Sequence, residues 1–224
     1  MIEWPDLTAF FLSFKLATLT TLILLVIGTP LAWWLARTNN RIKPLIETLV
    51  ALPIVLPPTV MGFYLLILLG PNGWLGGFWV SLTGQALTFS FAGLVVASVV
   101  YSLPFVIQPL QNGFESVSPR LLEAARTLGA KPLDAFFTIA VPVAKRGFLT
   151  ATVLGFAHTL GEFGVVLMVG GNIPGETKVI AIEIYNQVEM LNYAQAHVLS
   201  AMLLILAFVM IFAMYWINNK GRSS

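Results

Sequence analysis

The chain has 224 residues, of which 58% are hydrophobic and only 10% carry a charge. A water-soluble domain carries about a quarter charged residues, so this composition excludes a soluble globular protein and indicates a membrane protein. The net charge of +2 gives no sign of a nucleic-acid-binding surface, and the absence of cysteine excludes disulfides and cysteine-ligated zinc.

Five apolar runs are long enough to cross a bilayer, which takes about 20 apolar residues in a helix. They cover residues 7–36, 45–69, 86–110, 142–169 and 194–217. A sixth run, which begins at Trp74, has about ten residues and is too short to span. We expect it to form an interfacial loop with Trp74 and Trp79 at the depth of the lipid headgroups. The sequence therefore predicts an all-α membrane protein, a single domain over residues 1–224 with five transmembrane helices.

Positive charge is unevenly distributed between these runs. Five spans place the two termini on opposite sides of the membrane. If the N-terminus is outside, ten of the twelve Lys and Arg residues lie on the cytoplasmic side, namely Arg37, Arg41, Lys43, Arg120, Arg126, Lys131, Lys145, Arg146, Lys220 and Arg222. Because cytoplasmic loops of membrane proteins are rich in Lys and Arg, we expect an outside N-terminus and a cytoplasmic C-terminus.

Prolines interrupt the second and third runs. Pro53, Pro57 and Pro58 lie within the second run, and Pro104 and Pro109 lie within the third. Each proline removes a backbone donor, and helices that are broken at membrane depth often line a cavity. A single proline can equally be a packing kink. The clustering in the second run makes Pro57 and Pro58 candidates for a transport pathway or gate.

A polar segment, residues 118–141, separates the third run from the fourth. Ser118 precedes a proline, which is typical of a helix start, and Gly129 is typical of a helix end. Pro132 begins a second short helix, with Asp134 in its first turn, where the helix dipole favours an acid. The segment therefore predicts a cytoplasmic hairpin of two helices.

Apolar side chains gather on one face of the first hairpin helix. Leu121, Ala125 and Leu128 are spaced i, i+4 and i+7, with Leu122 beside them. Such a hairpin can lie on the lipid surface. However, its other face has mixed charge, and the small Ala124 permits close approach of a partner's backbone. These features favour docking into a groove of another protein.

Residues 123–142, EAARTLGAKPLDAFFTIAVP, resemble the EAA loop of ABC-importer permeases. In that family the loop forms a coupling helix that sits in a cleft of a cytoplasmic ATP-hydrolysing subunit. The resemblance implies ATPase-coupling roles for Leu121, Leu122, Glu123, Ala124, Ala125, Leu128 and Gly129.

Residues 52–62, LPIVLPPTVMG, and 157–185, AHTLGEFGVVLMVGGNIPGETKVIAIEIY, are similar to segments of molybdate permeases. Sulfate and thiosulfate permeases share parts of this pattern, IPGET at 173–177 favours molybdate, and tungstate remains an alternative. The resemblance implies a non-catalytic permease subunit of a prokaryotic plasma (inner) membrane. It also implies a homodimer, cytoplasmic ATP-binding subunits that bind the ATP, an extracytoplasmic molybdate-binding protein, and no cofactor on this chain.

Glu162 is the only acid in the interior of a predicted span. A charge at membrane depth costs about 2.5–3.5 kcal/mol, so this side chain must face protein or water or be protonated. A carboxylate is a poor ligand for a dianion. We therefore favour a role in helix packing or gate architecture over substrate contact, with Gly161 and Gly164 allowing close helix approach.

His158 lies one turn before Glu162, a spacing at which the two side chains meet. Without an HExxH motif or a third ligand, we expect a hydrogen-bonded pair and no metal site. An intramembrane enzyme that uses this pair is the alternative from another class, although the sequence has no nucleotide-binding or serine-nucleophile motif. No Lys or Arg lies deep in a span, so we expect an anion to pass loosely, past hydroxyls and helix ends.

Overall fold

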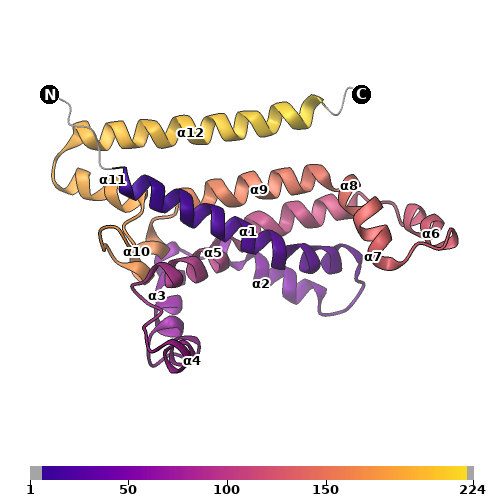
Figure 1. Cartoon of the computed structure of the whole chain (residues 1–224), viewed down its shortest axis with the longest axis horizontal. Helices are drawn as coiled ribbons and strands as arrows, with labels where there is room; N and C mark the ends of the chain where they lie inside the picture. The colour runs from indigo at the N-terminus through magenta and orange to yellow at the C-terminus, as the bar shows by residue number, and fades with distance from the viewer. Residues whose placement is uncertain (1–6, 221–224) are drawn as a thin grey trace.

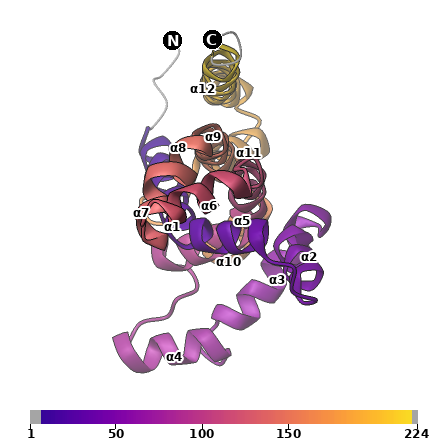
Figure 2. The ribbon, with the colours of Figure 1, turned by 90° about the vertical axis from the view of Figure 1, so that its right-hand side faces the viewer.

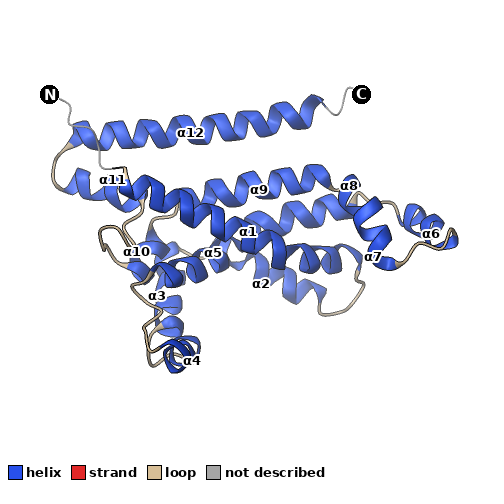
Figure 3. Ribbon diagram, in the orientation of Figure 1, coloured by secondary structure: helices blue, strands red, loops and turns tan. Residues whose placement is uncertain are grey.

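Residues 7–220 are described in the computed structural model of the chain, and all of the regular structure in this part is helical (Figures 1 and 3). The predicted all-α fold class is therefore confirmed. Arg222, which contributed to the charge argument, lies outside the described residues.

Three helices form the centre of the bundle: α1 (Thr8–Arg37), α5 (Phe91–Glu115) and α9 (Lys145–Leu160). Each of them packs against the other two (Figure 1). A fourth long helix, α12 (Tyr193–Lys220), lies along the outer side of α9 and α11 (Ile180–Glu189) and leaves most of its apolar surface exposed. This arrangement suits a bundle whose outer faces meet lipid.

Within the described residues, three helices are long and apolar enough to cross a membrane: Thr8–Arg37, Phe91–Glu115 and Tyr193–Asn219. Two bent pairs also qualify by composition. Lys43–Val55 and Pro58–Leu69 are bent by 114°, and Pro132–Val143 and Lys145–Leu160 by 70°. The number of candidate spans is therefore three, or up to five if each bent pair is one span.

The predicted second span, residues 45–69, is two helices rather than one straight helix. Helix α2 (Lys43–Val55) ends just before Leu56, which has an extended backbone with ψ of 135°. Helix α3 (Pro58–Leu69) begins at the second proline of the pair. Steric clash with a following proline disfavours the helical conformation, so the two consecutive prolines produce the sharp bend.

The third and fourth predicted spans also differ in their bounds. Helix α5 covers Phe91–Glu115 instead of 86–110, because the Ser90 hydroxyl caps its start by accepting a 3.1 Å hydrogen bond from the Gly93 amide. The run 142–169 is divided into α9 and α10 (Gly164–Gly170), with a break at residues 161–163. Glycine's backbone freedom favours a break in this region.

Two further helices lie where the sequence analysis predicted none. The run that begins at Trp74 is helix α4 (Trp74–Thr83), so the expected loop was wrong. This helix projects away from the bundle (Figure 2) and leaves 82% of Trp74 exposed. Helix α11 lies in the segment between the fourth and fifth predicted spans. Rules for span length alone do not detect such short helices outside the long spans.

The predicted hairpin is present and projects from one end of the bundle, which we call the hairpin end (Figure 1). Its first arm is α6 (Pro119–Thr127). Its second arm runs from α7 (Pro132–Ala135) through a π-helical turn, Phe136–Ala140, into α8 (Val141–Val143). Asp134 lies in the first turn of α7, as expected.

Gly129 ends the first arm in the left-handed region, with φ of 86°. Its amide donates to the Arg126 carbonyl and the Ala130 amide donates to the Ala125 carbonyl, both over 3.0 Å. This pair of bonds is the Schellman motif, which confirms the predicted helix stop. Helix α6 begins at Pro119 with Ser118 in the N-cap position, which confirms the predicted helix start, although the Ser118 side chain makes no capping bond.

Helices α5 and α9 approach each other closely near the hairpin end. A Cβ atom added to Gly147 would lie 2.7 Å from the Pro109 carbonyl oxygen and 2.9 Å from the Gly113 Cα. Only glycine permits this contact between backbones, which is a common device for packing membrane helices.

Candidate functional site

Glu162 lies in the break between α9 and α10 and is the centre of a buried polar cluster. Only 4% of the residue is exposed. The Ser98 hydroxyl donates to its Oε2 over 2.7 Å, and the Ser102 hydroxyl donates to its Oε1 over 2.6 Å. The Nδ1 atom of His158 lies 3.4 Å from Oε1, so the expected contact between the two side chains is present.

Ser102 connects the members of this cluster. Its Oγ lies 2.9 Å from His158 Nδ1 and 2.8 Å from Thr159 Oγ1. Ser98 and Ser102 are fully buried, one turn apart on α5. Together these bonds tie the break after α9 to the middle of α5. We call Ser98, Ser102, His158, Thr159 and Glu162 the serine–glutamate cluster.

A cavity of about 570 Å³ adjoins this cluster, and we call it the cluster cavity. It is lined by Pro58, Thr59, Tyr101, Ala157, His158, Gly161, Glu162, Phe163 and Gly164. Of the six residues predicted for the pathway or gate, only Pro57 is missing from this lining. The fold thus brings the proline break of the second run and the glutamate of the fourth to one place.

The two glycines beside Glu162 differ in their surroundings. A Cβ atom on Gly164 would lie 2.8 Å from the Cβ of Pro58, so this glycine does allow the start of α10 to approach α3 closely. A Cβ atom on Gly161 would meet nothing nearer than 3.7 Å. The predicted role in close packing therefore applies to Gly164 and is wrong for Gly161.

The chemistry of the cluster is that of hydrogen bonding between helices. Within the described part of the chain, no three His, Cys, Asp or Glu side chains are grouped so that they could hold a metal ion. The carboxylate of Glu162 accepts hydrogen bonds from two hydroxyl groups and lies beside His158. A buried carboxylate with this set of partners acts as a fixed acceptor that joins two helices.

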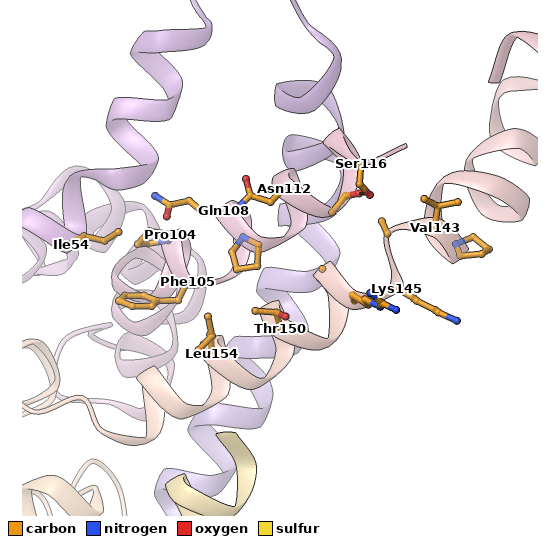
Figure 4. Close-up of a pocket in the computed structure, with 16 residues that line it drawn as sticks. Ile54, Pro104, Phe105, Gln108, Asn112, Ser116, Val143, Lys145, Thr150 and Leu154 are labelled. Carbon is orange, nitrogen blue, oxygen red and sulfur yellow. Dashed lines mark hydrogen bonds between the residues drawn. The ribbon is translucent and has the colours of Figure 1, made fainter. Parts of the chain in front are cut away.

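A second cavity, of about 830 Å³, lies between α5 and α9 toward the hairpin end (Figure 4). We call it the inner cavity. Phe105 lines it and stacks on the ring of His158, with the ring centroids 3.8 Å apart. Since His158 lines the cluster cavity, this ring pair lies in the wall shared by the two cavities. The sequence analysis did not identify the inner cavity.

The residues predicted for coupling divide into two groups on α6. Leu122 and Ala125 are buried, with 8% and 7% of their surface exposed, and they pack into the bundle core. The exposed group comprises Leu121, Glu123, Ala124, Leu128 and Gly129. Of the predicted apolar face, Ala125 packs on the bundle beside Leu122, its i, i+3 neighbour, while Leu121 and Leu128 stay exposed.

Aromatic rings join the second arm of the hairpin to the bundle. Phe136 lies 5.2 Å from Trp33 on α1 and 5.8 Å from Phe114 on α5, measured between ring centroids. The guanidinium of Arg37 donates to the Val117 carbonyl over 2.7 Å, directly before α6. These contacts were not predicted, and they fix both ends of the hairpin to α1 and α5.

Comparison with known proteins gives a consistent result. The family described as binding-protein-dependent transport system inner membrane component matches residues 28–222. The molybdenum transport system permease protein ModB of Azotobacter vinelandii is 58% identical over 94% of this chain and 93% of that protein. ModB of Escherichia coli (strain K12) is 38% identical over 83% of this chain and 81% of that protein. A probable sulfate transport system permease protein cysT of Marchantia polymorpha is 33% identical over 97% of this chain and 74% of that protein.

Solved structures share the fold. A bacterial alginate ABC transporter in complex with a pentasaccharide-bound periplasmic protein superposes with a TM-score of 0.74, at 16% identity, over 95% of this chain and 78% of that one. The MetNI methionine ABC transporter in an inward-facing conformation gives a TM-score of 0.69, at 16% identity, over 95% of this chain and 94% of that one. At these identities the likeness concerns the fold alone.

Proposed function

This chain belongs to the binding-protein-dependent transport system inner membrane component family, and on that premise we propose that it is the permease subunit of an ATP-driven molybdate importer. The observation that carries the substrate is the 58% identity to ModB of A. vinelandii over nearly the whole of both chains. The sulfate permease relative is more distant, at 33%. Tungstate, a tetrahedral dianion like molybdate, is the remaining alternative.

The permease subunit is not itself catalytic. Its relatives are membrane components of ABC transporters, in which ATP is used by partner subunits. This chain supplies the membrane passage and the surface that receives the ATPase. The cluster cavity and the serine–glutamate cluster belong to the passage, and the hairpin is that surface.

The proposed topology has five spans in a prokaryotic plasma membrane, with each bent pair crossing once. The N-terminus is outside and the hairpin is cytoplasmic, as supported by the Lys and Arg residues near the hairpin end. Two copies of the chain form the passage. An extracytoplasmic binding protein delivers molybdate to the outer side, because the sequence places no Lys or Arg deep in a predicted span to bind the anion tightly.

Helix α5 transmits the motion of the ATPase subunits from the hairpin to the membrane passage. In this proposal, the exposed side of α6, with Leu121, Glu123 and Leu128, docks on the ATPase, while Leu122 and Ala125 hold it to the bundle. When ATP binding closes the ATPase pair, the hairpin moves and its aromatic contact at Phe114 moves α5. Because α5 is one continuous helix that also carries Ser98 and Ser102, the motion reaches Glu162 and the break after α9.

Uptake of labelled molybdate by cells with and without this chain tests the proposed substrate. We expect deletion to abolish high-affinity uptake and plasmid-borne wild-type chain to restore it. Unlabelled tungstate is expected to compete and a large excess of sulfate is not. Unchanged molybdate uptake together with lost sulfate uptake would retain the transporter architecture and reject the substrate.

A further inference from the structure

The inner cavity has a lining suited to an anion. It takes its polar groups from Gln108 and Asn112 on α5, from Ser116 directly after α5, and from Lys145, Arg146 and Thr150 on α9. Two of these six residues are cationic, and no aspartate or glutamate lines the cavity. An enclosure that holds two positive charges and no acid attracts anions and repels cations.

Two amide groups face this space without other partners. Gln108 and Asn112 lie one turn apart on α5, and among the described residues neither side chain has a hydrogen-bond partner. Figure 4 shows them on one side of the space, with Thr150 and Lys145 on the other. Amide, hydroxyl and ammonium groups all donate hydrogen bonds, and the oxygens of a tetrahedral oxyanion accept them.

Two acids near this lining already have hydrogen-bond partners. Glu115, which directly precedes Ser116 in the chain, accepts a 3.0 Å hydrogen bond from Gln111. Glu47 on α2 lines an adjoining recess that also includes Gln108 and Asn112. Its carboxylate accepts a 2.8 Å hydrogen bond from Gln111 and lies 3.7 Å from the ammonium of Lys43. The ammonium of Lys43 partly offsets the charge of Glu47, and neither Glu47 nor Glu115 lines the inner cavity. Lys145 and Arg146 are therefore the charged residues of its lining.

The cluster cavity has the opposite character. Glu162 is the only acid in its lining, and neither Lys nor Arg lines it. The cluster cavity therefore provides no positive charge to bind a dianion. The inner cavity, on the far side of the Phe105–His158 ring pair, provides hydrogen-bond donors and positive charge. The difference in charge between the two cavities favours movement of an anion toward the hairpin end.

We propose that the inner cavity is a transient binding site for a tetrahedral oxyanion dianion, held by Lys145, Asn112, Gln108 and Thr150 after it has passed the Phe105–His158 pair. This inference rests on the proposed function, since the dianion is the transported substrate. The volume of about 830 Å³ leaves room for a hydrated ion, so binding is loose and release into the cytoplasm is fast. The phosphate of a lipid headgroup has the same chemistry, and the experiment distinguishes the two sources.

The test uses the absence of cysteine from the chain. A single cysteine is introduced by Asn112→Cys or, as a second variant, Thr150→Cys. Each is studied in the complete complex with its ATPase subunits, reconstituted without nucleotide in vesicles of neutral phosphatidylcholine. A small anionic thiol reagent is expected to label these cysteines faster than a cationic reagent of the same size. Sodium molybdate is expected to slow the labelling, while sodium chloride of equal ionic strength does not.

Two controls make the result specific. Ser81→Cys on α4, far from the cavity and exposed, is expected to label at the same rate with and without molybdate. Adding Lys145→Gln to Asn112→Cys is expected to raise the molybdate concentration needed for protection by about tenfold or more, which is the effect of losing one charge-assisted hydrogen bond.

Three outcomes would overturn the inference. One is labelling of both cavity cysteines that molybdate does not change. Another is protection by vesicles containing anionic phospholipid but not by molybdate, which would assign the cavity to a lipid headgroup. The third is complete lack of labelling, which would mean that a second copy of the chain covers the cavity. Molybdate uptake by the wild-type complex is measured in parallel, and its absence would reject the proposed function instead.

Discussion

A Glu162→Leu permease is expected to insert and assemble normally but to lose about tenfold or more of its molybdate uptake. The variant removes the acceptor for Ser98 and Ser102. Hydrogen bonds between membrane helices are each worth about 0.6–1.7 kcal/mol, so losing two shifts the balance between conformations by about 8-fold to 300-fold. Leucine also avoids the cost of a charge at membrane depth, about 2.5–3.5 kcal/mol, so total stability changes little.

The controls separate the hydrogen bonds from the charge. Glu162→Gln keeps the shape and one acceptor oxygen, and it is expected to retain much of the uptake. A Ser98→Ala, Ser102→Ala double variant keeps the glutamate but removes both donors, and it should resemble Glu162→Leu. The measurements are initial uptake rate and the amount of assembled complex in the membrane. Uptake by Glu162→Leu at the wild-type rate would show that the cluster has no role in transport.

A Gly129→Val permease is expected to uncouple ATP hydrolysis from transport. Gly129 has φ of 86° and an added Cβ atom meets nothing within 4 Å, so the strain arises from the backbone alone. The left-handed conformation costs an ordinary residue about 1–2 kcal/mol, and β-branched residues are especially unfavourable there. Relief of this strain disturbs the two bonds of the Schellman motif and moves α6 relative to α7. Uptake is expected to fall by about tenfold.

The chain provides a matched control for this backbone strain. Gly175 has φ of 76° and likewise has nothing within 4 Å of an added Cβ, but it lies in the loop between α10 and α11, two helices at the opposite end of the bundle from the hairpin (Figure 1). Gly175→Val is therefore expected to keep coupling, and Gly129→Asn to keep part of it because asparagine tolerates the left-handed region. Uptake and ATPase rate are measured on the same reconstituted complexes. Equal loss in both valine variants would remove the argument for the hairpin turn.

Local sequence signals predicted the features that depend on neighbouring residues. The apolar runs indicated the long helices, Gly129 indicated the end of α6, and the adjacent Pro57 and Pro58 indicated a broken span. The angle of the break, 114°, could not be predicted, because it depends on how α3 packs against α10. The i, i+4 spacing of His158 and Glu162 predicted their contact for the same local reason.

Contacts between distant segments could not be read from one sequence. Ser98 and Ser102 are 64 and 60 residues away from Glu162, and two serines within an apolar run were the only signal that the sequence offered. Arg37 and Val117 are 80 residues apart. The division of α6 into buried Leu122 and exposed Leu128 depends on which side meets the bundle, and periodicity does not specify that side. The inner cavity likewise requires α5 and α9 to be placed together.

Uptake by a purified, reconstituted transporter tests the central claim most directly. Vesicles containing this permease and its ATPase subunits are loaded with ATP, and labelled molybdate is supplied outside together with the molybdate-binding protein. We expect accumulation of molybdate inside the vesicles that requires ATP, the binding protein and this chain. Accumulation that is unchanged when ATP is omitted, or when this chain is left out, would contradict the assignment as an ATP-driven importer permease.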